Sequence, residues 1–275
     1  MKAKIVIPLL SVIILSLITA AWAAETGLDI YPRNVHIGLG FNGAEITVSG
    51  RAPDDAGIFV KVSSPADSIT VMNKKGKVGM FWLNTERVRM TEVPRLYHII
   101  SSAPFSQVSA DLRQQLGLGG DFPEIYSRAI IDKHREDDWV PVTGEEALEY
   151  IEASIGINRK NGLYFTGEKS VKVEDGKFSG KVRLPPGIPQ ETIDVTMYAI
   201  RDGQLLDIKT GSINVSSTGI IQWLNIMAFY DGPSYGLIAV IIALVSGVLI
   251  TTLFNYAESL LGGSEKPGIG RELNH

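Results

Sequence analysis

The sequence contains no cysteine, and this absence excludes several kinds of chemistry. A chain without cysteine cannot form disulfides, use a thiolate nucleophile or hold a metal ion by thiolate ligands. Exported domains of eukaryotic cells usually carry disulfides, so an exported chain of this composition is better interpreted as bacterial. Its stability must then come from an ordinary apolar core.

The usual catalytic motifs are missing as well. The four histidines form neither H-E-x-x-H nor a paired metal-binding spacing, and the serines form neither G-x-S-x-G nor S-x-x-K. The glycines within 117–120 follow a helical pattern and are expected to end a helix rather than to bind phosphate. We therefore predict no catalytic, cofactor-binding or metal-binding residue and no cofactor. An enzyme that uses scattered carboxylates is the least favoured alternative.

An excess of positive charge is also absent. Residues 24–257 carry 22 Lys and Arg against 27 Asp and Glu, which gives no basis for nucleic acid binding. The charge is uneven: 61–95 holds seven basic and three acidic residues, and 121–152 holds three basic and ten acidic residues. We expect two solvated surfaces, with the alternatives that the blocks face each other or bind different partners. A basic surface that meets an anion keeps a ligand-binding or sensor module open as an alternative function.

Two apolar runs, one at each end of the chain, indicate a membrane protein. Residues 1–23 combine a basic start, a short apolar stretch and the pattern Ala21-Trp22-Ala23, which predicts a signal peptide cleaved after Ala23. The uncharged run 237–254 covers roughly 27 Å as a helix, close to the hydrocarbon core of a bilayer. We predict a single transmembrane helix over 235–256 in the bacterial inner membrane, with a periplasmic domain before it and a cytoplasmic tail over 257–275.

One face of the predicted span carries small residues at a spacing of four. Small residues at this spacing let two helices approach closely. We predict that this face packs against a second copy of the helix or against a membrane transporter, while the rest of the span contacts the lipid bilayer. The residues of this face are Ala239, Ala243, Gly247 and Thr251.

The juxtamembrane segment 218–234 joins the domain to the span. Its part 219–230 is apolar, uncharged and rich in aromatic residues. We expect an interfacial helix that holds the domain close to the membrane, with a linker packed against the domain as the alternative. Aromatic side chains favour the membrane interface, and we predict that Trp223, Tyr235 and Tyr256 lie there.

Between the apolar runs, the sequence pattern is typical of strands, then helices, then strands. The predicted fold class is mainly β with a helical insertion: immunoglobulin-like β-sandwich lobes, one or more, followed by the single transmembrane α-helix. The expected parts are a β-sandwich lobe over 24–103, a helical segment over 104–160 and a second β lobe over 161–217. Two packed lobes bridged by the helices are favoured over one sandwich with an inserted helical segment.

Three local patterns in the sequence give specific expectations. The basic run 73–77 is predicted to be a turn, because it lies between two apolar stretches. The charged run 132–138 is expected to be a solvated helix end, with weak binding of a divalent cation as the alternative. Trp82 and Tyr97 are expected to be buried in the core or to pack between the lobes.

Four short motifs occur in an order that is similar to a known family. They are Phe41-Asn42-Gly43-Ala44-Glu45, Gly79-Met80-Phe81-Trp82-Leu83-Asn84-Thr85, Val93-Pro94-Arg95-Leu96-Tyr97 and Tyr235-Gly236-Leu237-Ile238-Ala239-Val240. On these motifs the chain resembles the transmembrane protein family Alph_Pro_TM over nearly its whole length. The resemblance implies an exported domain and one C-terminal span. It implies no functional residue, because the family has no established activity.

Members of that family are often encoded beside sulfite-exporter-like permeases, which implies a membrane partner. The resulting hypothesis is a non-enzymatic, membrane-anchored periplasmic protein that binds or assists a membrane partner such as a transporter.

Overall fold

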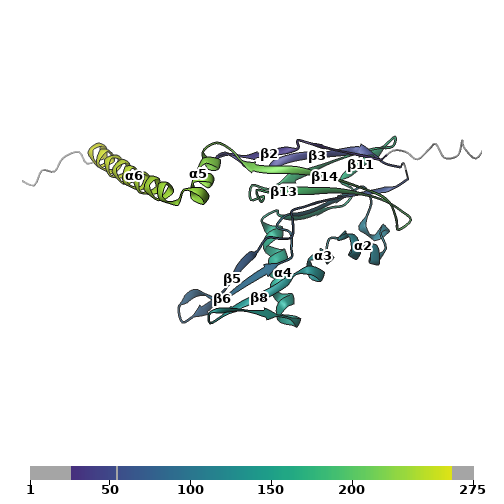
Figure 1. Cartoon of the computed structure of the whole chain (residues 1–275), viewed down its shortest axis with the longest axis horizontal. Coiled ribbons are helices and arrows are strands. Elements are labelled where there is room, and N and C mark those ends of the chain that lie inside the picture. Colours follow the sequence, from purple (N-terminus) through teal and green to yellow (C-terminus); the bar gives the residue numbers. More distant parts are fainter. Residues whose placement is uncertain (1–25, 54, 262–275) are drawn as a thin grey trace, which may run out of the picture. The chain divides into compact units, whose positions relative to one another are not determined.

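The structure, a computed structural model, describes residues 26–53 and 55–261 (Figure 1). The predicted signal peptide over 1–23 and the tail beyond 261 lie outside the described residues. The chain divides into two compact units between Ser217 and Thr218. The first unit is mainly β with inserted helices, and the second consists of two helices, the last of them apolar. The predicted fold class is confirmed at this level, and its immunoglobulin-like detail stays a prediction.

Two sheets of the first unit share one apolar core. The smaller sheet has the order β1 (Gly27–Tyr31), β3 (Ala44–Arg51), β12 (Lys177–Leu184) and β11 (Val171–Glu174). The larger sheet has the order β10 (Tyr164–Gly167), β7 (Tyr97–Ser101), β4 (Gly57–Ser63), β13 (Thr192–Arg201), β14 (Gln204–Ser217) and β2 (Asn34–Ile37). Side chains alternate between core and solvent along β12, so one face of the strand contributes to the core.

The strands before and after the helices belong to the same sheets. β12 pairs with β3 along its whole length, and β13 pairs with β4. The favoured division into separate lobes over 24–103 and 161–217 therefore does not describe the sheets. The sheets are described instead by the alternative, in which one β body carries an inserted segment. The physical reason is size, because about 55 residues of strand bury too little surface to form a core alone.

The inserted part contains a third sheet as well as helices. The sheet has the antiparallel order β5 (Thr70–Val78), β6 (Phe81–Thr91), β8 (Ile130–Arg135) and β9 (Asp138–Val142). The helical elements are η1 (Phe105–Gln107), α2 (Ala110–Leu116), α3 (Pro123–Arg128) and α4 (Gly144–Lys160). A second core lies between these helices, this sheet and the outer face of the larger sheet. As expected, α2 ends at a glycine, Gly117, which adopts a left-handed conformation with φ 69°.

The run 132–138 is a hairpin between β8 and β9, so the expectation of a helix end is wrong. In the sheet register Ile131 lies between Met90 and Val142, and it is buried. This cross-strand packing outweighs the local preference that the charged residues express.

The basic run 73–77 lies inside β5, so the predicted turn is also wrong. The chain reverses two residues later at Gly79 and Met80, where Gly79 has φ 64°. Glycine adopts this backbone conformation without strain, as the two-residue turn of a hairpin requires.

The second unit consists of α5 (Gly219–Tyr230) and α6 (Gly232–Leu261). Asp231 separates them, and its carboxylate accepts a hydrogen bond from the backbone N–H of Ser234 at 3.2 Å, which caps the start of α6. Within α6, the candidate span Gly232–Ser259 contains an 18-residue window with a mean hydropathy of 2.8, and this window is not buried against any other part of the described chain. A helix of this length and composition suits the interior of a bilayer.

Candidate functional site

The end of the β5–β6 hairpin exposes four consecutive apolar side chains. These are Met80, Phe81, Trp82 and Leu83, which we call the hairpin tip. Phe81 and Trp82 expose 68% and 69% of their surface, and Met80 exposes 88%. Isolated apolar residues are common on protein surfaces, but a contiguous aromatic cluster is typical of an interaction site.

The register of the third sheet explains why the tip is exposed. β8 pairs with β6 only from Val88 to Thr91. The preceding part of β6 pairs with β5 alone and forms a two-stranded ribbon (Figure 1). Successive side chains of a strand point to opposite faces, so Phe81 and Trp82 lie on different faces of this ribbon. A single covering layer therefore could not bury them both.

Glu86 marks the boundary between the ribbon and the rest of the sheet. Its carboxylate lies 2.8 Å from Nζ of Lys133 on β8 and accepts a hydrogen bond from the Tyr150 hydroxyl on α4 at 2.6 Å. The hydrogen bonds from Lys133 and Tyr150 lower the pKa of Glu86, and burial opposes them only in part. These contacts attach the base of the hairpin to the protein and leave the tip unattached.

Lysines accompany the tip on the neighbouring strand. In the hairpin register Lys77 is opposite Trp82, and Lys75 is opposite Asn84. β5 is an edge strand of its sheet, and lysine on an edge strand discourages pairing with a strand of another chain. The tip is thus suited to contact through side chains rather than through strand addition.

The two aromatic residues expected in the core have different positions. Tyr97 is fully buried, as expected. Trp82 is exposed, so the expectation for it is wrong. Four apolar residues in succession fit a strand that is buried on both faces, and only the register shows that neither face of β6 is covered here.

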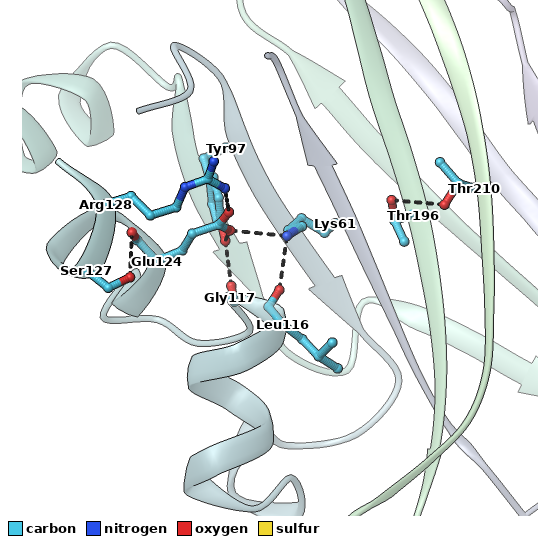
Figure 2. A network of polar contacts seen from close by, with 9 residues as sticks. All are labelled: Lys61, Tyr97, Leu116, Gly117, Glu124, Ser127, Arg128, Thr196 and Thr210. Carbon is cyan, nitrogen blue, oxygen red and sulfur yellow. Dashed lines mark hydrogen bonds and ion pairs between the residues drawn. The ribbon is translucent and has the colours of Figure 1, made fainter. Parts of the chain in front are cut away.

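A network of polar contacts joins the inserted helices to the larger sheet (Figure 2). Glu124 on α3 lies at its centre, with one carboxylate oxygen 3.1 Å from Nζ of Lys61 on β4 and 2.6 Å from the hydroxyl of Tyr97. Its other oxygen accepts a hydrogen bond from Arg128 at 2.9 Å. Nζ of Lys61 also donates to the backbone carbonyl of Leu116 at 3.0 Å. Each charged group of the network therefore has an opposite charge within hydrogen-bond distance.

Burial and charge act in opposite directions on the pKa of Glu124. Burial raises the pKa, but the hydrogen bond from Tyr97 and the charge of Lys61 together lower it more, so it lies below its usual value. The pKa of the Tyr97 hydroxyl is raised, first by burial and then by the charge of Glu124. Glu124 is therefore charged and Tyr97 protonated at neutral pH. The network therefore holds α3 against the larger sheet through a charged carboxylate.

The basic and acidic blocks of the sequence meet in the structure. The expectation of two separate solvated surfaces fails where four ion pairs join the blocks, which face each other there, while other charged residues of both blocks are exposed. The pairs are Lys61–Glu124 at 3.1 Å, Lys74–Glu149 at 2.8 Å, Arg89–Asp132 at 2.8 Å and Lys133–Glu86 at 2.8 Å. Sequence analysis did not single out these residues, since only the charge asymmetry between 61–95 and 121–152 pointed to them. Within 26–53 and 55–261, no group of three or more His, Asp or Glu side chains is placed to hold a metal ion.

The predicted helix-packing residues all lie on α6 and are exposed. The hydroxyl of Thr251 donates to the backbone carbonyl of Gly247 at 2.8 Å, so this polar group is satisfied within the helix. A helix face with small side chains and a hydroxyl that is already hydrogen-bonded suits close packing against another helix in lipid. The packing itself stays a prediction. The other members of this face are Ala239 and Ala243.

The three predicted interface aromatics are exposed in the second unit. Trp223 lies on α5, and Tyr235 and Tyr256 lie near the two ends of α6. About 21 residues of helix separate the two tyrosines, which corresponds to roughly 30 Å of rise. This spacing suits one aromatic residue at each membrane interface, which stays a prediction.

Comparison with known proteins identifies a family. Residues 27–256 match the family described as "Putative transmembrane protein (Alph_Pro_TM)". The match covers most of the first unit and the apolar part of α6. No curated protein and no solved structure matches the chain.

Proposed function

Because the chain belongs to the Alph_Pro_TM family of transmembrane proteins, we propose that it is a single-pass, membrane-anchored binding protein rather than an enzyme. In this proposal the first unit is periplasmic, α6 spans the bacterial inner membrane, and the domain binds a membrane protein partner such as a transporter. The observation that carries the proposal is the exposed hairpin tip.

The tip has the composition of a binding hot spot. Binding energy at protein interfaces is concentrated in a few large side chains, among which tryptophan is enriched. Removing apolar surface from water gains about 25 cal/mol per Å², so covering Phe81 and Trp82 would stabilise a complex. The lysines beside the tip carry positive charge, so they favour a partner surface with acidic groups or carbonyl oxygens. We therefore expect an apolar pocket whose rim carries such groups.

The anchor supports a partner in the same membrane. A domain tethered by α6 meets other membrane proteins at a high effective concentration, so a small contact surface is sufficient. The small-residue face of α6 offers a second contact, at Ala243 and its neighbours. A ligand-binding or sensor module that meets an anion through 61–95 is less favoured, because Lys61, Lys74 and Arg89 already pair with carboxylates.

Photo-crosslinking in intact membranes tests the proposed partner. A photoreactive amino acid replaces Trp82, and the matched control replaces Leu39, another exposed apolar residue outside the hairpin. We expect a protein adduct of one defined mass from position 82 and none from position 39. Adducts with lipid alone from position 82 would overturn the protein partner and would indicate that the tip contacts the bilayer.

The absence of cysteine makes the proposed orientation easy to test, because a single introduced cysteine is labelled without background. Leu39→Cys and Ser264→Cys place one thiol in the domain and one in the tail. A maleimide that cannot cross the inner membrane should label the first in intact spheroplasts and the second only after lysis. The opposite pattern would overturn the periplasmic assignment.

A further inference from the structure

Strand β12 has an open edge along its second half. Its pairing with β11 ends at Gly180, whereas β12 itself continues to Leu184 and pairs with β3 along its whole length. The preceding strand β10 belongs to the larger sheet, so the chain crosses from one sheet to the other before β11 begins. In the part of the chain that the structure describes, no strand therefore lies beside 181–184 on this side. We call this stretch the β12 edge.

The hydrogen-bonding pattern of β12 shows which backbone groups lie at this edge. The turn 175–176 joins β11 to β12, its residues have φ 49° and 69°, and Glu174 lies opposite Lys177. Residues that flank a two-residue turn form a hydrogen-bonded pair, so the N–H and C=O of Lys177 point toward β11. This direction alternates along an antiparallel strand, so the same groups of Lys181 and Arg183 point to the open side. In the described chain no backbone hydrogen bond reaches either residue from that side.

A cavity of about 410 Å³ lies beside the β12 edge, between the two sheets. Lys181 and Arg183 line it from the smaller sheet, and Ile100 and Phe165 line it from the larger sheet. Ile100 is 1% exposed and belongs to the shared core, whereas Phe165 is half exposed. The cavity is thus a recess with an apolar floor, at the place where the smaller sheet lacks a strand. The other lining residues are His98, Gly162, Ser170, Pro185 and Pro186.

A strand added at this edge would place its side chains on two different faces. Val182 lies between the two open positions, is 2% exposed and faces the shared core. Lys181 and Arg183 are exposed on the outer face of the sheet. Residues that lie opposite each other in a sheet share a face. The residue opposite Val182 therefore enters the cavity, and the residues opposite Lys181 and Arg183 stay on the outer face.

The charges of the β12 edge indicate which strand suits it. Arg183 forms no ion pair among the described residues, and the pair of Lys181 with Glu45 is exposed. If two copies of the edge paired about Val182, Lys181 of one copy would lie opposite Arg183 of the other. Like charges directly opposite each other destabilise a sheet, whereas opposite charges stabilise it. The edge therefore disfavours a second copy of this chain and favours acidic residues at these two positions.

We propose that the β12 edge binds an extended peptide segment of a partner protein, which adds to the smaller sheet antiparallel to β12. Two acidic residues of the peptide lie opposite Lys181 and Arg183, and one apolar residue between them fills the cavity. Main-chain hydrogen bonds supply affinity in this mode of recognition, and the contacts of alternate side chains supply specificity. The site shares no residue with the hairpin tip, so either proposal can fail without the other.

Methylation of single peptide nitrogens tests strand addition. The probe is the peptide Thr-Thr-Glu-Ile-Glu-Thr-Thr with blocked ends, titrated by calorimetry into the full chain in detergent micelles. In the proposed pairing the N–H groups of both glutamates donate to the carbonyls of Lys181 and Arg183, and the isoleucine N–H points away. Methylation of the glutamate nitrogens should weaken binding at least about tenfold, and methylation of the isoleucine nitrogen by less than about threefold. Equal weakening would overturn strand addition, and no binding at about 1 mM probe would overturn the site.

Hydrogen exchange locates the bound peptide. NMR of the chain labelled with ¹⁵N-lysine and ¹⁵N-arginine follows the amides of Lys181 and Arg183, together with that of Lys177, which β11 already covers. In the free chain the first two amides should exchange faster than the amide of Lys177. The probe should slow their exchange at least about tenfold and leave Lys177 unchanged. Binding without protection of Lys181 and Arg183 would contradict the proposed site.

A pair of charge reversals separates the β12 edge from general attraction of an acidic peptide. Arg183→Glu and Lys177→Glu make the same change at exposed positions of one strand, but only Arg183 lies at the open edge. We expect Arg183→Glu to weaken the probe at least about fivefold and Lys177→Glu to change its binding by less than about twofold. A probe with lysine in place of both glutamates should bind the Arg183 variant better than the unchanged chain. Equal weakening by the two substitutions would contradict the proposal.

Discussion

The two ends of the β5–β6 hairpin both carry large apolar side chains, but these side chains have different surroundings. At the base, Val88 and Met90 are 1% and 0% exposed and face the second core. At the tip, Phe81 and Trp82 are mostly exposed. The difference arises because β8 pairs only with the base. Apolar residues in one strand can thus serve two purposes: those at the base stabilise the fold, and those at the tip are available for binding.

The largest expected effect is at the base. Met90→Ala removes a fully buried side chain and leaves a cavity, so we expect it to lower the free energy of unfolding by about 2–5 kcal/mol. Urea unfolding of the full chain in micelles, followed by circular dichroism, measures this change. A loss below about 0.5 kcal/mol would show that the base does not support the fold.

A smaller effect is expected at the boundary between base and tip. Glu86→Gln keeps the shape of the side chain but removes the charge that Lys133 and Tyr150 contact. We expect a loss of about 1–2 kcal/mol in the same unfolding measurement. The control is Glu45→Gln, since Glu45 forms an exposed ion pair with Lys181, and exposed pairs contribute about 0–1 kcal/mol. Equal losses of unfolding free energy in the two variants would show that Glu86 contributes no more than an exposed ion pair does.

The pH dependence of stability should follow from the same carboxylates. The pKa values of Glu86 and Glu124 lie below the usual 4.5, because hydrogen bonds and cations stabilise their charged forms in the folded protein. The stability they contribute is present above the unfolded-state pKa and is lost as pH falls through the folded-state pKa. Unfolding free energy should therefore fall as the pH drops below about 5. The decrease should be smaller in a Glu86→Gln, Glu124→Gln double variant, and an unchanged decrease would show that other groups cause it.

The smallest effect on stability is expected at the tip. Trp82→Ala removes a large side chain that packs against little of the described protein, so we expect a change within about 0.5 kcal/mol. The comparison with Met90→Ala in the same assay is direct, because both residues belong to β6. A loss at Trp82 as large as that at Met90 would mean that the tip is part of the fold.

Sequence reasoning succeeded where one physical property dominates a long segment. The span is recognised because 237–254 is uniformly apolar, and the β class follows from repeated short alternating runs. It failed where distant contacts decide. The sequence around Ile131 does not show that this residue lies between Met90 and Val142 in the sheet. The sequence around Trp82 does not show that β8 pairs only with a later part of β6 and leaves Trp82 uncovered. The burial of His98, whose Nε2 lies 2.8 Å from the carbonyl oxygen of Gly162, likewise depends on segments that only the fold brings together.

The central claim is that the hairpin tip binds a partner and does not stabilise the fold. The most direct test places a photoreactive amino acid at Leu83 in intact membranes and compares Trp82 with Trp82→Ser in the otherwise identical chain. The account predicts that the yield of the protein adduct falls at least about tenfold while the free energy of unfolding changes by less than about 0.5 kcal/mol. An unchanged adduct yield, or a loss of adduct that only accompanies unfolding, would contradict it.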